Sequence, residues 1–215
     1  MKISSSNYST QFKAHKVATT KNTIGKVVTN IDIYKLGRED ASFLKKLADS
    51  IDFKKLFPKL NEYALDRWNN IFRYCISGAL SNINTSYIAF SDNKPCGILT
   101  YYPDRNNLFL DGICSIPTQI NQKVNLVGKT LFYQIFKDAQ ENNAKGIVLS
   151  AVNNGPFNVV NKYEELGFKK DPTTYPYTKM FCNKHKIADQ LKELPFSIQY
   201  KTTKDEKINL NNLMN

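Results

Sequence analysis

A short stretch after a predicted strand carries residue types that bind phosphate groups. Gly128 falls in the first turn of a predicted helix, where backbone amides without intrahelical partners and the positive end of the helix dipole hold anions. Lys123, Lys129 and the Thr130 hydroxyl add cationic and donor groups. The same stretch also fits an ordinary helix start, with Asn125 as the N-cap and Gly128 as a packing glycine. Taken alone, the stretch leaves both interpretations open.

A tyrosine follows one strand and one helix further along the chain. Tyr163 lies in a predicted helix that ends at Gly167, with Phe168 as the apolar residue beyond it. Beside a phosphate-bearing cofactor, its phenol could donate a proton during a reaction. It could equally be a core aromatic, because Phe157, Val160 and Tyr163 form an apolar stripe.

These residues need a scaffold, and hydrophobic periodicity predicts one. Strands are predicted at 27–34, 86–90, 96–102, 108–116, 147–152 and 177–181, with a further possible strand at 196–200. Helices are predicted over 39–51, 62–80, 126–142, 154–167 and 184–194. The order β-α-α-β-β-β-α-β-α-β indicates a mixed sheet, with an antiparallel meander first and a parallel crossover later.

Composition divides the chain into three parts. Residues 1–27 are rich in Ser, Thr, Lys and Asn and show little periodicity, so we predict a flexible basic tail. Residues 28–182 are predicted to form one domain. Residues 183–215 are predicted to form a C-terminal extension with a helix, a strand and a tail.

The net charge of +11 is concentrated towards the ends. Residues 1–30 carry 5 lysines and no acid, residues 31–182 carry 19 basic and 15 acidic residues, and residues 183–215 carry 6 lysines and 4 acids. A basic arm could contact RNA. The chain nevertheless has 26 Lys, 24 Asn and only 4 Arg, a usage that an AT-rich genome also produces, and arginine is the usual specific reader of nucleic acid. Nucleic acid is therefore a possible partner but not a favoured one.

Other residue classes narrow the chemistry further. The four cysteines (Cys75, Cys96, Cys114 and Cys182) are far apart among apolar residues, which predicts reduced, mostly buried thiols and no metal site. No apolar run is long enough to span a membrane, and the first residues lack an apolar signal core. We expect a cytoplasmic protein without a membrane partner, as a monomer or a homodimer.

The order of elements and three local motifs resemble the GNAT superfamily of acetyl-CoA-dependent N-acyltransferases, over roughly residues 28–182. The motifs are Ile116-Pro117, Gly128-Lys129-Thr130-Leu131-Phe132 and Lys162-Tyr163-Glu164-Glu165-Leu166-Gly167-Phe168. In that family a strand ending near proline leads into an Arg/Gln-x-x-Gly-x-Gly/Ala loop and a helix, and a later helix ends in Tyr-x-x-x-Gly-Phe. The resemblance implies an α/β fold (an α+β mixed sheet), with strands 1–4 antiparallel, then a βα crossover, and helices on both faces.

The resemblance also implies where the cofactor would bind. The backbone of Ile113, Cys114 and Ser115 would pair with the pantetheine arm. The pyrophosphate would lie against Lys123, the amides of Val124, Asn125, Leu126, Val127, Gly128 and Lys129, and the Thr130 hydroxyl. The chain departs from the family pattern at two places, because Lys123 occupies the Arg/Gln position and Leu126 occupies the place of the first glycine. The asparagine that often begins the tyrosine-bearing helix has no aligned match, although Asn154 lies just before Pro156 and would be a cofactor contact.

Catalytic roles follow from the same resemblance. Tyr163 would protonate the leaving thiolate, and a phenol pKa near 10 suits a thiolate of pKa about 8–9. Asp111, on the strand that enters the cofactor loop, is the best carboxylate to take a proton from the amine. A solvated strand-end aspartate, or a water relay in its place, is the alternative.

The implied function is transfer of an acetyl group from acetyl-CoA to a primary amine of a small molecule or a protein. The amine would attack directly in a ternary complex, and no metal would be needed. The acceptor would lie along residues 53–73 and 173–178. Two alternatives stay open: a non-catalytic acyl-CoA-binding or protein-interaction module, favoured by the altered glycine loop, and an RNA-directed acetyltransferase that acts on aminoacyl-tRNA.

Overall fold

A mixed sheet forms the centre of the protein. The computed structural model describes residues 14–24, 27–152, 159–174, 178–200 and 207–213. The 10-stranded sheet has the order β10-β1-β2-β3-β4-β5-β6-β8-β7, and β9 pairs with β1 off this path. Its strands are β1 (Ala14–Ile24), β2 (Val27–Lys35), β3 (Thr85–Ser91), β4 (Lys94–Asp104), β5 (Asn107–Ser115), β6 (Gly146–Ala151), β7 (Lys169–Lys170), β8 (Thr178–Asn183), β9 (Ser197–Tyr200) and β10 (Lys207–Ile208).

The strand directions confirm the predicted mixed sheet. Strands β1 to β5 are joined antiparallel, β5 and β6 are parallel, and β6 and β8 are antiparallel again. A helix between β5 and β6 makes the one crossover that a parallel pair requires. The order of elements in the sequence therefore predicted the antiparallel meander and the βα unit that follows it.

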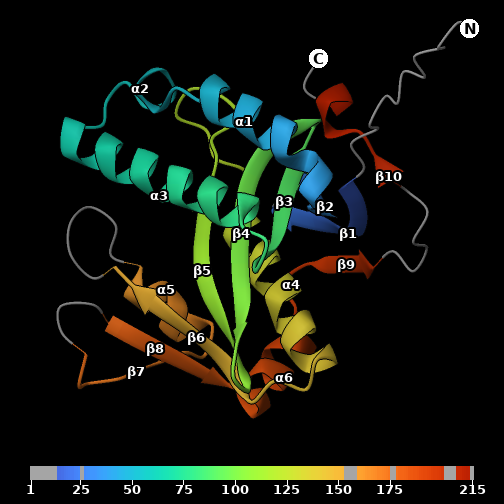
Figure 1. Cartoon of the computed structure of the whole chain (residues 1–215), viewed down its shortest axis with the longest axis vertical. Coiled ribbons are helices and arrows are strands. Elements are labelled where there is room, and N and C mark those ends of the chain that lie inside the picture. The colour runs from blue at the N-terminus through green and yellow to red at the C-terminus, as the bar shows by residue number, and fades with distance from the viewer. Residues whose placement is uncertain (1–13, 25–26, 153–158, 175–177, 201–206, 214–215) are drawn as a thin grey trace, which may run out of the picture.

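Helices cover both faces of the sheet (Figure 1). They are α1 (Ala41–Ser50, after the 3-10 turn Arg38–Asp40), α2 (Phe53–Leu56), α3 (Glu62–Leu80), α4 (Val127–Glu141), α5 (Val160–Glu165) and α6 (Lys184–Lys192), with a final 3-10 turn at Leu210–Leu213. We call the side covered by α1, α2 and α3 the α3 face, and the side covered by α4, α5 and α6 the α4 face. Each face has its own buried core, centred on Phe43 and Phe72 on the α3 face and on Leu131 and Phe136 on the α4 face.

The predicted flexible tail over residues 1–27 is wrong for Ala14–Ile24. These residues form β1, which pairs with β2 along its length. The inward residues of β1 include Ala18, Thr20 and Asn22, all almost fully buried. They are small or polar, so the strand carries no apolar alternation that periodicity could detect. Lys16 also forms an ion pair with Asp32 at 2.7 Å, which reduces the charge available to an RNA.

The C-terminal segment is likewise part of the sheet and not only an extension. The predicted helix and strand are present as α6 and β9, and both β9 and β10 pair with β1. Leu210 is fully buried in the core of the α3 face. Hydrophobic periodicity missed β1 and also three short elements, α2, β7 and β10. The four cysteines are free and buried, as predicted.

No helix among the described residues is long and apolar enough to cross a bilayer.

Candidate functional site

The parallel strands β5 and β6 separate at the centre of the sheet. Their ladder ends at the pair Leu110–Leu149, and a register shift in β5 at the same point makes Asp111 an extra residue opposite β4. The Ile116 amide donates to the Cys96 carbonyl on β4. In an antiparallel pair, every second residue directs its amide and carbonyl away from the partner strand, so those of Ile113 and Ser115 point away from β4. They therefore face the gap beside β6, where an extended ligand could add to the strand.

A pocket of about 500 Å³ opens from this gap. Its walls are the end of β5, the loop before α4, the first turn of α4, and α5. The predicted site residues that line it are Ile113, Cys114, Ser115, Lys123, Val124, Asn125, Leu126, Val127, Gly128, Lys129 and Tyr163. The structure thus brings the predicted phosphate loop, strand edge and phenol to one pocket.

The surroundings of Gly128 argue against a packing glycine at the start of α4. A Cβ built on Gly128 would meet no atom within 4 Å, so no neighbouring group requires a glycine there. In contrast, a Cβ on Gly97 would lie 2.4 Å from Val127, so the glycine of β4 allows the first turn of α4 to pack against the sheet. The 15-residue helix therefore directs its unpaired N-terminal amides at a pocket where Gly128 leaves the backbone open.

Leu126 is the N-cap of α4 and adopts the left-handed conformation, with φ 65° and ψ 5°. This is the position where the family pattern has glycine, and only glycine adopts this conformation without steric cost. Leucine keeps the loop geometry because its partly buried side chain packs against the core of the α4 face. The left-handed conformation of Leu126 is therefore a source of strain in the loop.

Substitutions at Leu126 should show this strain directly. We expect Leu126→Gly to be more stable than Leu126→Ala by about 1 kcal/mol, because both lose the same packing and only alanine keeps the left-handed penalty. Urea unfolding measures the difference. At Gln140, an exposed position inside α4, the same pair should show the opposite order, with alanine the more stable. Equal stabilities at position 126 would contradict the assignment of strain.

Lys123 lies against an aromatic wall of the pocket. Its Nζ is 3.9 Å from the centre of the Trp68 ring and 5.5 Å from that of Phe57. Burial, and secondly the charge of Lys162, lowers the pKa of Lys123. Lys123, Lys129 and Lys162 all line the pocket, so three cations gather near the α4 amides and suit a ligand with several phosphate charges.

Tyr163 is held among aromatic rings. Its ring centre lies 5.5 Å from that of Phe132 and 6.1 Å from that of Phe168. Burial raises the pKa of its phenol to about 12, so the group stays protonated at neutral pH. The ring packs against the core of the α4 face and the residue also lines the pocket, so a core position and a place at the pocket are compatible.

Asp111 does not line the pocket but lies at the point where β5 and β6 separate, on the α3 face. Its carboxylate accepts hydrogen bonds from Tyr74 Oη and Asn84 Nδ2, both at 2.8 Å, and from Thr100 Oγ1 at 3.5 Å. Burial, with smaller contributions from Cys114 and then Asp111, raises the pKa of the nearby Cys75 thiol. Asp111 is thus a carboxylate fixed by three donors beside the gap from which the pocket opens.

Thr130, like Asp111, is a predicted site residue that does not line the pocket. Thr130 is fully buried, because it lies about 200° around the helix from Gly128 and so faces the core. The prediction of Thr130 as a phosphate contact is therefore not supported. Asn154 lies outside the described residues.

Residues from α3 complete the site. Residues 53–73 were predicted to line the acceptor, but the contacts of Trp68 and Tyr74 were not predicted. Trp68 Nε1 donates to the carbonyl of Ser115 at 3.2 Å, which fixes the end of the exposed strand edge. Tyr74 holds Asp111 from the same helix. The sequence places these residues on an apolar helix but gives no register between that helix and β5, so their partners were not predictable. Lys162 was within a quoted motif, and its position beside Tyr163 on α5 could have suggested its role.

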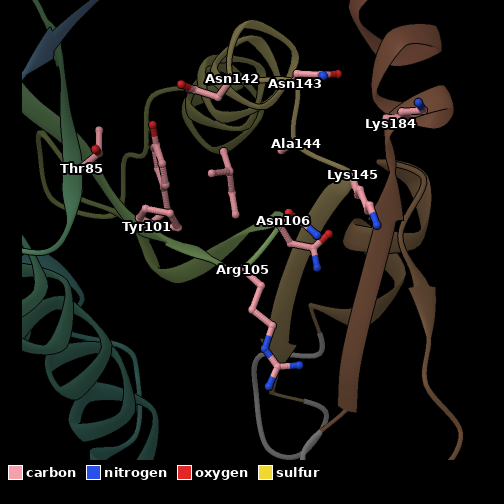
Figure 2. A pocket seen from close by; sticks show the side chains of 12 residues that line it. Thr85, Tyr101, Arg105, Asn106, Asn142, Asn143, Ala144, Lys145 and Lys184 are labelled. Carbon is pink, nitrogen blue, oxygen red and sulfur yellow. The ribbon is translucent and has the colours of Figure 1, made fainter.

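A second pocket, of about 540 Å³, lies at the other end of the sheet, near the β4–β5 turn (Figure 2). Arg105, Lys145 and Lys184 line it together with asparagines at the end of α4 and in the β4–β5 turn. No predicted catalytic residue lies there, and Arg105 points away from the centre of the pocket (Figure 2). The smaller pocket at α4 therefore remains the candidate active site.

Comparison with known proteins was made by sequence and by structure. No protein-family model and no curated protein sequence matches the chain. Among solved structures, apo FdhC, a nucleotide-linked sugar GNAT, is 11% identical, with 86% of this chain and 97% of FdhC covered and a TM-score of 0.53. The chain has the GNAT fold. At this identity the likeness concerns the arrangement of the elements, and the ligand and the reaction depend on the chain's own residues.

Other GNAT-fold structures match with lower TM-scores. PaiA N-acetyltransferase from Thermoplasma acidophilum, in complex with coenzyme A, is 19% identical and covers 71% of this chain and 98% of its own, with a TM-score of 0.48. A GNAT family acetyltransferase from Elizabethkingia anophelis with acetyl-CoA bound is 14% identical and covers 71% and 97%, with a TM-score of 0.43.

Proposed function

We propose that this GNAT-fold protein is an N-acyltransferase that moves an acetyl group from acetyl-CoA to a primary amine by direct attack within a ternary complex. One observation carries the proposal: an exposed strand edge, an open helix N-terminus at Gly128 and a neutral phenol at Tyr163 share one pocket. Each has a counterpart in acetyl-CoA, namely the amide-containing pantetheine arm, the pyrophosphate and the thioester.

Binding of acetyl-CoA would use backbone groups more than side chains. The amide and carbonyl of Ile113 face the gap, where a pantetheine arm lying as an added strand would pair with them. The Ser115 carbonyl already accepts from Trp68, so Ile113 and the Ser115 amide would carry this pairing. The α4 amides would hold the pyrophosphate, with Lys129 and Lys162 neutralising its charge.

The reaction needs a nucleophile without its proton and a protonated leaving group. The amine nitrogen forms a bond to the thioester carbonyl carbon, the carbon–sulfur bond breaks, and the sulfur leaves as a thiolate. Tyr163 supports this departure by donating its hydroxyl hydrogen bond to the sulfur and then its proton. The nitrogen, which is positively charged after the attack, loses one proton to give the amide, and this proton restores the phenol of Tyr163 directly or through water. Burial that raises the pKa of the phenol to about 12 would also raise the pKa of a thiol in the same pocket, so the proton transfer remains feasible.

Asp111 would receive the amine. Its carboxylate attracts the ammonium form, and it can accept the proton, directly or through water, that the amine loses before attack. The three donors from Tyr74, Asn84 and Thr100 fix the carboxylate, which favours its role as a positioned base over that of a solvated strand-end residue.

Replacement of Asp111 by asparagine should separate these roles. We expect kcat/KM for the amine to fall by about 10²-fold, with affinity for acetyl-CoA retained. The free energy of unfolding should fall by about 1–3 kcal/mol, because the asparagine NH₂ cannot accept a hydrogen bond and one of the three donors loses its partner. Asp104→Asn, in the exposed β4–β5 turn, is the matched control and should change neither quantity. Full activity of Asp111→Asn would leave only the water relay.

The whole proposal is tested by two measurements on the full chain. Isothermal calorimetry with acetyl-CoA should show binding at tens of micromolar or tighter, and thiol release should rise on addition of a suitable amine. Absence of acetyl-CoA binding would refute the proposal. Binding without thiol release across a broad amine panel would identify a non-catalytic acyl-CoA module.

A further inference from the structure

An aromatic row crosses the α3 face next to Asp111. Tyr102, Phe109, Val148 and Phe181 are successive cross-strand partners on β4, β5, β6 and β8. Cross-strand partners point to the same face of a sheet. The neighbouring residues Leu110 and Leu149 point the other way, into the core of the α4 face. We call these four residues the aromatic row.

The three rings of the row are partly exposed, and Val148 is buried between them. Tyr102 and Phe109 stack with ring centres 5.1 Å apart, and the Phe181 side chain is 41% exposed. A Cβ on Gly146 would lie 2.5 Å from the Phe181 ring, so this glycine lets the ring lie directly on β6. Among the described residues, α3 packs mainly on β3, β4 and β5, while the main helix contacts of β6 and β8 are with α4 and α6 on the other face (Figure 1). The rings are therefore within reach of a ligand on the α3 face.

Asp111 places a negative charge beside the row, next to Phe109. It follows Phe109 by two residues and points to the same face, towards Tyr74 and Thr100. Two residues of strand span about 6–7 Å, which sets the distance along β5 from Asp111 to Phe109. A carboxylate has roughly four acceptor positions and Asp111 uses three, so one remains for an ammonium group.

We propose that the aromatic row and Asp111 select the acceptor, which is a primary amine with one positive charge and an aromatic or branched alkyl group about 6–7 Å from its nitrogen. This inference rests on the proposed function, because it places the amine where the β5–β6 gap exposes the thioester. Charge complementarity with Asp111 fixes the ammonium end, and the row takes the apolar body.

The charges around the row disfavour a polyamine. Lys179 precedes Phe181 by two residues, and Lys169 is its cross-strand partner, so both lysines are at the outer end of the row. A second ammonium group on the acceptor would meet these cations instead of a carboxylate. An acceptor with a single positive charge and an apolar far end avoids this repulsion.

The test compares three amines on the full chain: 2-phenylethylamine, propylamine and spermidine. With acetyl-CoA present, thiol release should show kcat/KM at least about tenfold higher for 2-phenylethylamine than for the other two. Phe109→Ala should remove about tenfold of this preference through KM and retain the affinity for acetyl-CoA, because Phe109 is the ring of the row next to Asp111. Tyr63→Ala, which removes a 58% exposed ring from the far end of α3, should keep the wild-type preference.

The outcomes separate this inference from the proposed function. Turnover of propylamine or spermidine as fast as 2-phenylethylamine, or an unchanged preference in Phe109→Ala, would overturn the inference and leave an acetyltransferase. Lack of acetyl-CoA binding would refute the proposed function. In that case, saturation-transfer NMR would still test amine binding at the row, since 2-phenylethylamine should contact wild type and not Phe109→Ala, and absence of contact would overturn the inference.

Discussion

Replacement of Tyr163 by phenylalanine is expected to lower kcat by about 10²–10⁴-fold, which is the usual contribution of a positioned general acid. The ring would keep its contacts with Phe132 and Phe168, so the fold and the affinity for acetyl-CoA should be retained. Stopped-flow thiol release and calorimetry measure the two quantities. A fall in kcat without a change in acetyl-CoA affinity indicates a group that acts in the transition state.

The matched control is Tyr133→Phe. Tyr133 is also a buried tyrosine, on α4, with its hydroxyl 3.4 Å from Gln190 Oε1, and it does not line the pocket. Its loss should leave kcat unchanged. If Tyr163→Phe turned over as fast as wild type, the phenol would be only a core aromatic and another donor would have to protonate the thiolate.

The pH dependence gives a second readout of the same residue. Because burial raises the pKa of Tyr163 to about 12, its proton is present over the whole range in which the protein is assayed. Deprotonation of Tyr163 should therefore cause no fall in wild-type kcat below about pH 10. Any fall in that range should also be present in Tyr163→Phe. Such a loss would mean that the phenol is exposed in the complex.

Gly128→Ala is expected to stabilise the protein and weaken its ligand at the same time. The new Cβ meets no protein atom, and alanine in place of a helical glycine contributes about 0.5–1 kcal/mol. The same Cβ enters the pocket where the pyrophosphate would approach the backbone, so affinity for acetyl-CoA should fall at least about tenfold. Urea unfolding and calorimetry test the two opposite effects.

Gly78→Ala serves as the control, because Gly78 also lies in a helix but has neighbouring atoms too close to leave room for a Cβ. A Cβ there would lie 2.8 Å from both Asp111 Oδ2 and Thr100 Oγ1. This variant should lose stability, as core overpacking does. If Gly128→Ala bound acetyl-CoA as tightly as wild type, the phosphate site would not be at this turn.

Much of this site could be predicted from the sequence because its backbone parts are local. The bounds of α3, Glu62–Leu80, follow from its apolar spacing and from the N-cap Asn61, whose side chain accepts from the Ala64 amide. The loop before α4 and the glycine at its start are also adjacent in sequence. Local signals therefore sufficed for the part of the pocket built from consecutive residues.

The remainder depends on contacts between distant segments. The ring of Trp68 meets Lys123 and the Ser115 carbonyl only after α3 packs on β5, and helix periodicity does not fix that register. The helical phase of Thr130 was available from the 100° step per residue and argued against its assignment to the phosphate site. The aromatic row needed the alignment of four strands, which single-strand alternation does not supply.

The pairing of β1 with both C-terminal strands has a consequence for synthesis. Ser197 and the Lys21 carbonyl that it contacts are 176 residues apart, so the outer edge of β1 has no partner until almost the whole chain has left the ribosome. An uncovered edge strand invites pairing with other nascent chains. The polar and cationic residues of β1, which hid it from a search for apolar alternation, would keep that edge soluble while it waits for β9.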